Sequence, residues 1–147
     1  MIKVKNMINR FAGKHSFLSN FYSCKICIDG ITYPSAEHAF QAMKCLDREE
    51  RVRISFLNTP QEAKKAGRRV DLRSDWEDVK VDIMKSIVQS KFSDPELLNK
   101  LLDTGIEEIV EGNTWGDTFW GVYKGQGENM LGKILMEVRD EARESYE

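Results

Sequence analysis

Residues 24–46 have the sequence CKICIDGITYPSAEHAFQAMKCL, in which two kinds of local structure follow directly on each other. The β-branched residues on either side of Asp29-Gly30 predict a tight antiparallel hairpin, with strands over 24–28 and 31–33. The next segment predicts a helix over about 34–46, because its apolar residues recur at helical spacing. A hairpin that leads into a helix is typical of an α+β fold.

Capping residues and apolar periodicity predict further helices. Thr59-Pro60-Gln61-Glu62 is a capping box with proline at the first helical position. The predicted helices cover 48–57, 59–67, 74–92, 93–105 and 128–145, with short strands over 106–111 and 119–123. In the helix over 74–92 we expect the buried side to carry Trp76, Val79, Ile83, Ile87 and Phe92. The chain therefore predicts a helix-dominated α+β fold with a small antiparallel sheet.

The composition predicts one domain over 1–147, since 147 residues with 41% hydrophobic side chains supply one core and show no repeat or linker. Lys and Arg number 22 against 24 Asp and Glu, which argues against a protein that mainly coats DNA or an acidic membrane. The chain has no apolar leader and no run of roughly 18 apolar residues. We expect a soluble, cytoplasmic protein without a membrane partner.

Cysteine spacing raises the question of a metal. Cys24 and Cys27 have the Cys-x-x-Cys spacing of zinc and redox sites. On a strand, however, residues three apart point to opposite faces, and no second pair of ligands follows. We therefore predict structural thiols, no metal and no cofactor.

Chemically active side chains are concentrated in the helix predicted over 34–46. At about 100° per residue, Gln41 and Lys44 lie about 40° and about 20° from Glu37 around the axis, so all three share one face. Glu37 also lies in the first turn, where the helix dipole favours its ionised form. An acid, an amide and an amine on one stripe indicate acid–base chemistry. A solvated stripe is the alternative interpretation.

The segment Gly112–Gly121 is rich in glycine and aromatic residues and carries one acid, Asp117, between Trp115 and Trp120. Aromatic walls with a single carboxylate suit a planar heterocycle and a sugar hydroxyl. The alternative is an aromatic core strand with a turn aspartate. Upstream, Phe21 offers another aromatic wall and Asn20 an amide that can form two hydrogen bonds.

The basic cluster of the chain comprises Lys64, Lys65, Arg68, Arg69 and Arg73 and leads to Trp76 and Lys80. Arginines near a helix start favour a phosphate, so a nucleotide is a natural anionic ligand. A solvated face is the alternative. No Gly-x-Gly-x-x-Gly, Walker or His-Glu-x-x-His motif is present, which removes the common dinucleotide, NTPase and zinc-hydrolase classes.

Taken together, these segments resemble the NADAR family, in the family's order, from about Phe17 to Arg139. The motifs that carry the resemblance are Leu-Ser-Asn-Phe (18–21), Gly30 to Lys44, Ala63-Lys-Lys-Ala-Gly67, Arg73-Ser-Asp-Trp76, Asp117-Thr-Phe-Trp-Gly121 and Gly127-Glu-Asn-Met-Leu-Gly132. The resemblance implies a YbiA-like α+β domain. It also implies cleavage of a bond between ribose C1 and an exocyclic amine.

Two substrate classes follow from the resemblance: phosphorylated riboflavin-pathway intermediates, and ADP-ribosylated guanine in DNA or RNA. Glu37, Trp76, Asp117 and Trp120 match residues on which family activity depends, and Lys44 matches the family's helix lysine. We predict catalytic Glu37, Lys44 and Asp117. The predicted substrate-binding residues are Asn20, Phe21, Gln41, Arg73, Trp76, Lys80, Trp120, Gly121 and Asn129. A non-catalytic module that binds ADP-ribose or NAD is the alternative.

Two chemical routes are open for that bond. Water can attack C1 directly, with carboxylates stabilising oxocarbenium-like charge on the sugar. Alternatively, the Lys44 amine captures C1 of the opened sugar as a Schiff base that water then releases. An amine is nucleophilic only when neutral. We therefore expect burial, or a cation such as Lys80 or Arg73, to lower the pKa of Lys44.

Overall fold

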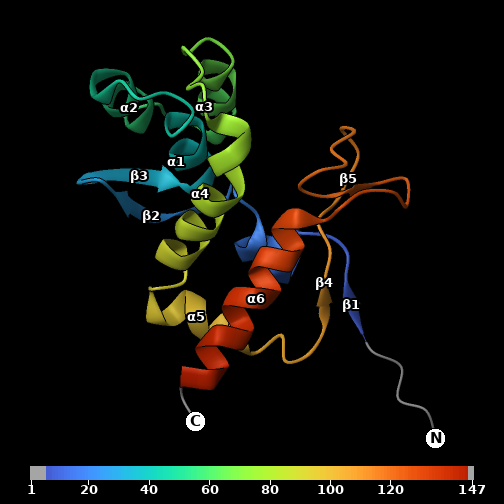
Figure 1. Cartoon of the computed structure of the whole chain (residues 1–147). Coiled ribbons are helices and arrows are strands. Elements are labelled where there is room, and N and C mark those ends of the chain that lie inside the picture. The colour runs from blue at the N-terminus through green and yellow to red at the C-terminus, as the bar shows by residue number, and fades with distance from the viewer. Residues whose placement is uncertain (1–5, 146–147) are drawn as a thin grey trace, which may run out of the picture. The chain divides into compact units, whose positions relative to one another are not determined.

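The computed structural model describes residues 6–145, which divide into two compact units. Residues 20–91 form one unit, here called the hairpin unit. Residues 6–19 and 92–145 form the other, here called the terminal unit because both ends of the described chain belong to it. Figure 1 shows helices and short strands in both, so the α+β class predicted from the sequence is confirmed.

The hairpin unit begins with the predicted antiparallel hairpin, formed by β2 (Ser23–Ile28) and β3 (Ile31–Ser35). The turn residues Asp29 and Gly30 have φ values of 52° and 78°. Positive φ at both central positions is the geometry that Asp-Gly favours, because its backbone twist matches that of the two strands. The hairpin prediction is confirmed.

Four helices complete this unit: α1 (Ala36–Ala42), α2 (Arg48–Ser55), α3 (Pro60–Gly67) and α4 (Trp76–Lys91). The Ser35 hydroxyl accepts the His38 N–H at the start of α1, and Thr59 accepts the Glu62 N–H at the start of α3. Both contacts satisfy amides that a helix start leaves unpaired. All seven residues of α1 are buried, because the hairpin and the three other helices pack around it.

Helix α1 is shorter than predicted, since it ends at Ala42 rather than near Leu46. The Lys44 and Cys45 amides donate to the carbonyls of Gln41 and Ala42, three residues back. This spacing tightens the chain into a turn. Lys44 therefore does not stand on the helix that carries Glu37, and its position has to be taken from its contacts.

The buried side of α4 differs from the predicted one. Val79 and Ile83 are only half-buried, and Phe92 lies beyond the helix in the terminal unit. The buried residues of α4 are Trp76, Met84, Ile87, Val88 and Lys91. The inward stripe is therefore rotated around the helix from the one that the apolar spacing indicated, and it includes a lysine.

The described part of the terminal unit contains two parallel strand pairs and two α-helices. β1 (Met7–Ile8) pairs with β4 (Glu108–Ile109), and β5 (Gly112–Asn113) pairs with β6 (Val122–Tyr123). The helices are α5 (Pro95–Leu102) and α6 (Met130–Ser145), with a 3-10 helix, η1, at Gly13–Leu18. The core includes Ile8, Phe17, Leu18, Phe92, Leu97, Leu101, Ile109, Leu131, Ile134, Leu135 and Val138.

The strands of this unit are shorter than the predicted 106–111 and 119–123, and their parallel pairing was not predicted. Glycines account for the short strands. A Cβ on Gly112 would lie 2.3 Å from the Asn9 carbonyl oxygen, and one on Gly121 would lie 2.3 Å from that of Glu111. Backbones approach so closely here that only glycine fits, and glycine weakens extended strands.

Within residues 6–145, no helix is long and apolar enough to cross a membrane. Over the same residues, no group of three or more His, Cys, Asp and Glu side chains is placed to hold a metal ion. Cys24, Cys27 and Cys45 are all free thiols.

Candidate functional site

The chemical residues of the hairpin unit centre on a buried carboxylate–amide pair. Gln41 Nε2 donates to Glu37 Oε1 over 2.7 Å, and the two side chains are 4% and 8% exposed. The Glu37 N–H donates to the Asn20 carbonyl over 2.9 Å, which ties the start of α1 to the predicted residue Asn20. The solvated-stripe interpretation is therefore wrong for Glu37 and Gln41.

Helix α3 lies directly against the Gln41 amide. A Cβ on Gly67 would be 1.8 Å from Gln41 Oε1 and 2.7 Å from its Cδ, so no larger residue fits at the end of α3 without displacing Gln41. Gln41 Oε1 is buried and has no hydrogen-bond partner among the described residues. A buried acceptor without a partner costs stability, so this oxygen is a candidate for binding a ligand group.

The Lys44 amine lies over two aromatic rings, 5.6 Å from the ring centroid of Phe40 and 6.0 Å from that of Trp76. The two rings pack on each other with centroids 5.1 Å apart. Trp76 is 7% exposed, so it is both part of the core and a wall of the lysine's surroundings. The faces of aromatic rings attract cations, which holds the amine in place.

Burial lowers the pKa of Lys44, and the positive charges of Arg68 and Lys64 lower it further, whereas the Glu37 carboxylate acts in the opposite direction. The predicted direction of this shift is confirmed. The cations responsible are Lys64 of α3 and Arg68, which caps that helix, rather than Arg73 and Lys80. Because Glu37 acts on the Lys44 amine, the acid and the amine remain neighbours although Lys44 lies outside α1.

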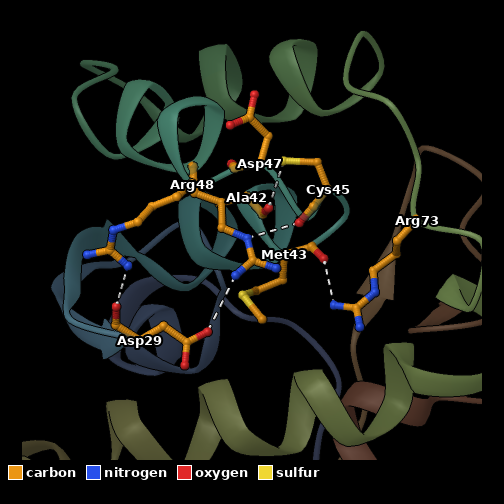
Figure 2. A network of polar contacts seen from close by, with 8 residues as sticks. Asp29, Ala42, Met43, Cys45, Asp47, Arg48 and Arg73 are labelled. Carbon is orange, nitrogen blue, oxygen red and sulfur yellow. Dashed lines mark hydrogen bonds and ion pairs between the residues drawn. The ribbon is translucent and has the colours of Figure 1, made fainter.

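Figure 2 shows that carbonyls of the residues just beyond α1 accept hydrogen bonds from arginines elsewhere in the chain. The Arg73 N–H donates to the Lys44 carbonyl over 2.8 Å, and Arg73 Nη1 donates to the Met43 carbonyl over 3.5 Å. Arg51 Nε donates to the Cys45 carbonyl over 2.9 Å. A continued helix would have paired these carbonyls with its own amides, so the arginine contacts satisfy them in its place.

The predicted phosphate ligands Arg73 and Lys80 both have acidic partners. Arg73 forms two hydrogen bonds to Asp75, of 2.6 Å and 3.1 Å, and Lys80 pairs with Glu77 over 2.6 Å. Arg73 also lines a pocket of about 600 Å³ together with Arg51, Met43, Val79 and Ile83. Glu37, Gln41 and Lys44 are not among the residues that line this pocket. Phe21 is 37% exposed at the start of the unit.

In the terminal unit, Asp117 organises a loop. Its Oδ1 accepts the N–H groups of Phe119 and Trp120 over 3.0 Å and 2.9 Å. Asn113 Oδ1 accepts the Asp117 N–H, and Asn113 Nδ2 donates to the Asp117 carbonyl. Trp120 is half-buried and packs edge-on against Phe119, with ring centroids 4.8 Å apart. Asp117 thus has the geometry of the turn aspartate named above as the alternative.

Asn129, another predicted ligand residue, is a structural link. It is 8% exposed and has a φ of 54°. Its Oδ1 accepts the Glu111 N–H and its Nδ2 donates to the Ile109 carbonyl, both over 2.9 Å. The amide therefore joins the end of β4 to the start of α6. Gly121 is the close-approach glycine described above.

The predicted site residues consequently fall into two groups. Glu37, Gln41, Lys44 and Trp76 come together in the hairpin unit, with Asn20 bound through its backbone. Asp117, Trp120, Gly121 and Asn129 belong to the terminal unit, and one site built from both groups remains a prediction. The sequence missed Lys64 and Arg68 as neighbours of Lys44, although both belong to the basic cluster named above.

A buried acid beside an amine whose pKa is lowered, both held by packed helices of an α+β protein, defines a site equipped for acid–base chemistry. The chain belongs to the NADAR domain family, which matches residues 8–143. The family prediction is thereby confirmed.

Relatives and a solved structure give the same result. The chain is 40% identical over 127 residues to the N-glycosidase YbiA of Shigella boydii, covering 84% of this chain and 79% of that protein. It is 39% identical over 134 residues to a riboflavin biosynthesis protein of Vibrio vulnificus, covering 88% of this chain but 36% of the longer relative. The NMR structure of Escherichia coli YbiA matches with a TM-score of 0.83 and 37% identity, covering 99% of this chain and 90% of YbiA.

Proposed function

We propose that this protein hydrolyses the bond between ribose C1 and an exocyclic amine of a phosphorylated ribosylamine. The observation that carries the proposal is the buried Glu37–Gln41 pair next to the Lys44 amine. Water adds across the bond, so that C1 gains a hydroxyl and the leaving nitrogen gains a proton.

The class of enzyme has the broadest support. Relatives that this chain covers to about four-fifths of their length are named N-glycosidases, and another is named a riboflavin biosynthesis protein. The sequence-based prediction of a hydrolase acting on N-glycosyl bonds is confirmed at this level. The small-molecule substrate belongs to the proposal, as do ADP-ribosylated DNA or RNA as alternative substrates, independence from metal and cofactor, and a cytoplasmic location.

Glu37 is proposed to exchange protons with the reacting groups, while Gln41 orients its carboxylate. The hydrogen bond from the Gln41 amide fixes the position of one Glu37 carboxylate oxygen. Asp117 is proposed as a second carboxylate and Trp76 and Trp120 as walls for the base. The remaining predicted ligands, Asn20, Phe21, Arg73, Lys80, Gly121 and Asn129, stay part of the proposal, and the contacts above give Asn129 a structural role as well.

Lys44 is proposed to attack C1 in its neutral form. The amine displaces the leaving nitrogen from C1 and the C1–O bond of the ribose ring opens, so that an imine between Lys44 and the opened sugar results. The two protons that the amine loses go to the leaving nitrogen and to the ring oxygen, which becomes a hydroxyl. Water then cleaves the imine and restores the free amine. Burial supports this route, because it lowers the pKa of Lys44 and so increases its neutral fraction near neutral pH.

The activity is tested by incubating the purified protein separately with a phosphorylated riboflavin-pathway ribosylamine and with an oligonucleotide carrying ADP-ribosylated guanine. Release of ribose 5-phosphate or of free ADP-ribose identifies the substrate class. Binding without release of either product would instead support a non-catalytic ADP-ribose module.

The route is tested by adding borohydride during turnover. A trapped imine raises the protein mass by the sugar adduct, and peptide mapping should place it at Lys44. Lys44→Arg keeps the charge and should abolish the adduct. If no adduct forms and Lys44→Arg turns over normally, water attacks C1 directly.

A further inference from the structure

The Lys44 amine belongs to a turn that the preceding helix holds only weakly. The Lys44 and Cys45 amides donate to carbonyls of α1 over 3.2 Å and 3.3 Å, at or beyond the long end of the ordinary range. Arg73 binds the same turn from the other side. Its N–H donates to the Lys44 carbonyl over 2.8 Å, and its Nη1 donates to the Met43 carbonyl over 3.5 Å (Figure 2). The position of the amine therefore depends on Arg73.

Residues 73–76 also supply an aromatic wall for the amine. The Trp76 N–H donates to the Arg73 carbonyl over 3.2 Å, which closes these four residues into one turn. The Trp76 ring centroid lies 6.0 Å from the Lys44 amine, and the ring packs on Phe40, the other ring beside that amine. One short segment thus contacts both the backbone and the amine of Lys44.

An ion pair orients the Arg73 guanidinium. Its Nε and Nη2 donate to the two carboxylate oxygens of Asp75 over 2.6 Å and 3.1 Å. The hydrogen bonds from Arg73 lower the pKa of Asp75, so the carboxylate is ionised near neutral pH. Two parallel bonds fix the plane of the guanidinium, and the third nitrogen, Nη1, then meets the Met43 carbonyl. A partly exposed ion pair adds little stability, so we expect this one to matter for orientation.

The ion pair influences Lys44 by position rather than by charge. The charges that act on the Lys44 amine belong to Glu37, Arg68 and Lys64, and Asp75 is not among them. Burial has the largest effect on the pKa of Lys44, and it depends on how the turn holds the amine over the two rings. A loosened turn would expose the amine to water and return its pKa toward 10.5.

Building on the function proposed above, we propose that Asp75 is a positioning residue for Lys44. It holds the Arg73 guanidinium against the turn that carries the amine, and so keeps the amine over the Phe40 and Trp76 rings. In that position burial increases the neutral fraction of the amine, which is the form that attacks C1.

The first test measures the pKa of Lys44 without any substrate, by NMR titration of the lysine amines, with Lys44→Arg to assign the signal. Asp75→Asn keeps the size of the side chain and removes its charge, and it should raise the pKa of Lys44 toward 10.5. Asp78→Asn is the matched control, because Asp78 is exposed in the first turn of α4 and loses the same charge. This variant should leave the pKa of Lys44 unchanged.

The second test measures turnover against pH. Asp75→Asn should lower kcat by about threefold or more near about pH 7, where the neutral amine is scarce, and the loss should shrink as the pH rises. If Asp75 only stabilised the fold, the loss would not depend on pH. If Arg73 only bound a substrate phosphate, its release from Asp75 would change KM and leave the pH dependence of kcat as in wild type.

Arg73→Lys gives a second, independent variant, and it decides the matter if melting curves show that Asp75→Asn does not fold. It keeps the charge but loses the planar fork, so it should raise the pKa of Lys44 as Asp75→Asn does. The double variant should differ little from either single one, since both substitutions break the same contact.

An unchanged pKa of Lys44 in folded Asp75→Asn or in Arg73→Lys would overturn the proposal. An equal rise in Asp78→Asn would also overturn it, since that would indicate a general charge effect. If the pKa rises as expected but the wild-type protein cleaves no ribosylamine, the positioning role stands and the N-glycosidase proposal fails. If the wild-type protein cleaves the substrate and the pKa does not change in the variants, the activity stands and Asp75 has no part in positioning Lys44.

Discussion

The surroundings of Glu37 in the hairpin unit and the loop around Asp117 in the terminal unit use polar side chains differently. In the first, Glu37 and Gln41 bind each other, one amide oxygen has no partner among the described residues, and the half-buried Lys44 amine lies nearby. In the loop, Asp117 and Asn129 bind backbone groups. Side chains that bind each other are available for chemistry, whereas those that bind the backbone are already needed for the fold.

The difference suggests how a carboxylate in each region should respond to substitution. If a carboxylate takes part in catalysis, replacing it by the corresponding amide should lower the enzyme's activity without lowering its stability. If a carboxylate stabilises a turn, the amide variant keeps an oxygen that can accept the hydrogen bonds of the turn, whereas the alanine variant does not. Substituting the two acids in parallel therefore separates the roles.

Glu37→Gln should have the largest effect on activity. Loss of the acid should lower kcat by about 10² to 10⁴, the range that general acid–base catalysis contributes. The fold should persist, because an amide can still accept the hydrogen bond from Gln41. The rate of product formation measures kcat, and melting curves measure stability. If the variant had the kcat of wild type, Glu37 would have no part in the mechanism.

Asp117→Asn and Asp117→Ala should separate chemistry from loop structure. We expect Asp117→Asn to keep the stability of wild type and to lower turnover by about 10² if the carboxylate is catalytic. Asp117→Ala should in addition lose about 1 kcal/mol of stability, as when a capping side chain is removed. Full activity of Asp117→Asn would make Asp117 a purely structural residue and complete the contrast with Glu37.

Local signals in the sequence were sufficient where neighbours in the chain determine the structure. The Asp29-Gly30 turn and the cap at Thr59 were predicted correctly, because each depends on residues within a few positions. The shared surroundings of Glu37, Gln41 and Lys44 also followed from spacing, although Lys44 reaches them from a turn rather than from the helix.

Distant contacts account for the differences. The end of α1 could not be predicted, because the donors that bind the carbonyls just beyond it include Arg73, about 30 residues further along the chain. The structural role of Asp117 depends on residues two and three positions further along, and a turn aspartate was therefore included as an alternative interpretation of the sequence. Gly67 of α3 lies against Gln41 of α1, and this contact between two helices cannot be predicted from the apolar periodicity of either helix.

Gly67→Ala tests whether the hairpin-unit site depends on that approach. The added methyl group would meet the Gln41 amide, so we expect a loss of about 1–3 kcal/mol of stability and reduced turnover. In a Gln41→Ala background the same substitution should cost much less, since the clash is removed. Equal costs in both backgrounds, measured by urea unfolding, would show that Gln41 is not the residue displaced.

The smallest predicted effect is on the pH dependence of stability and concerns His38. This residue shows that some polar side chains near Glu37 stabilise the fold. Its ring is buried between the Ser35 hydroxyl, at 2.7 Å from Nδ1, and the Leu57 carbonyl, at 3.0 Å from Nε2. The carbonyl can only accept, so Nε2 carries the proton and Nδ1 accepts from Ser35. Protonation of Nδ1 would break this arrangement.

Burial lowers the pKa of His38 below 6.5, while the Leu57 carbonyl and the Glu62 charge act in the opposite direction. Below pH 6.5 the unfolded chain therefore binds more protons than the folded one, and stability falls as the pH drops toward the folded-state pKa. Melting temperatures between about pH 7.5 and about pH 5.5 should fall less in His38→Gln than in wild type. His15→Gln, in the terminal unit, is the control and should keep the wild-type slope. If the slope flattens in His15→Gln instead, the pH sensitivity belongs to the terminal unit, and the buried ring at α1 does not control it.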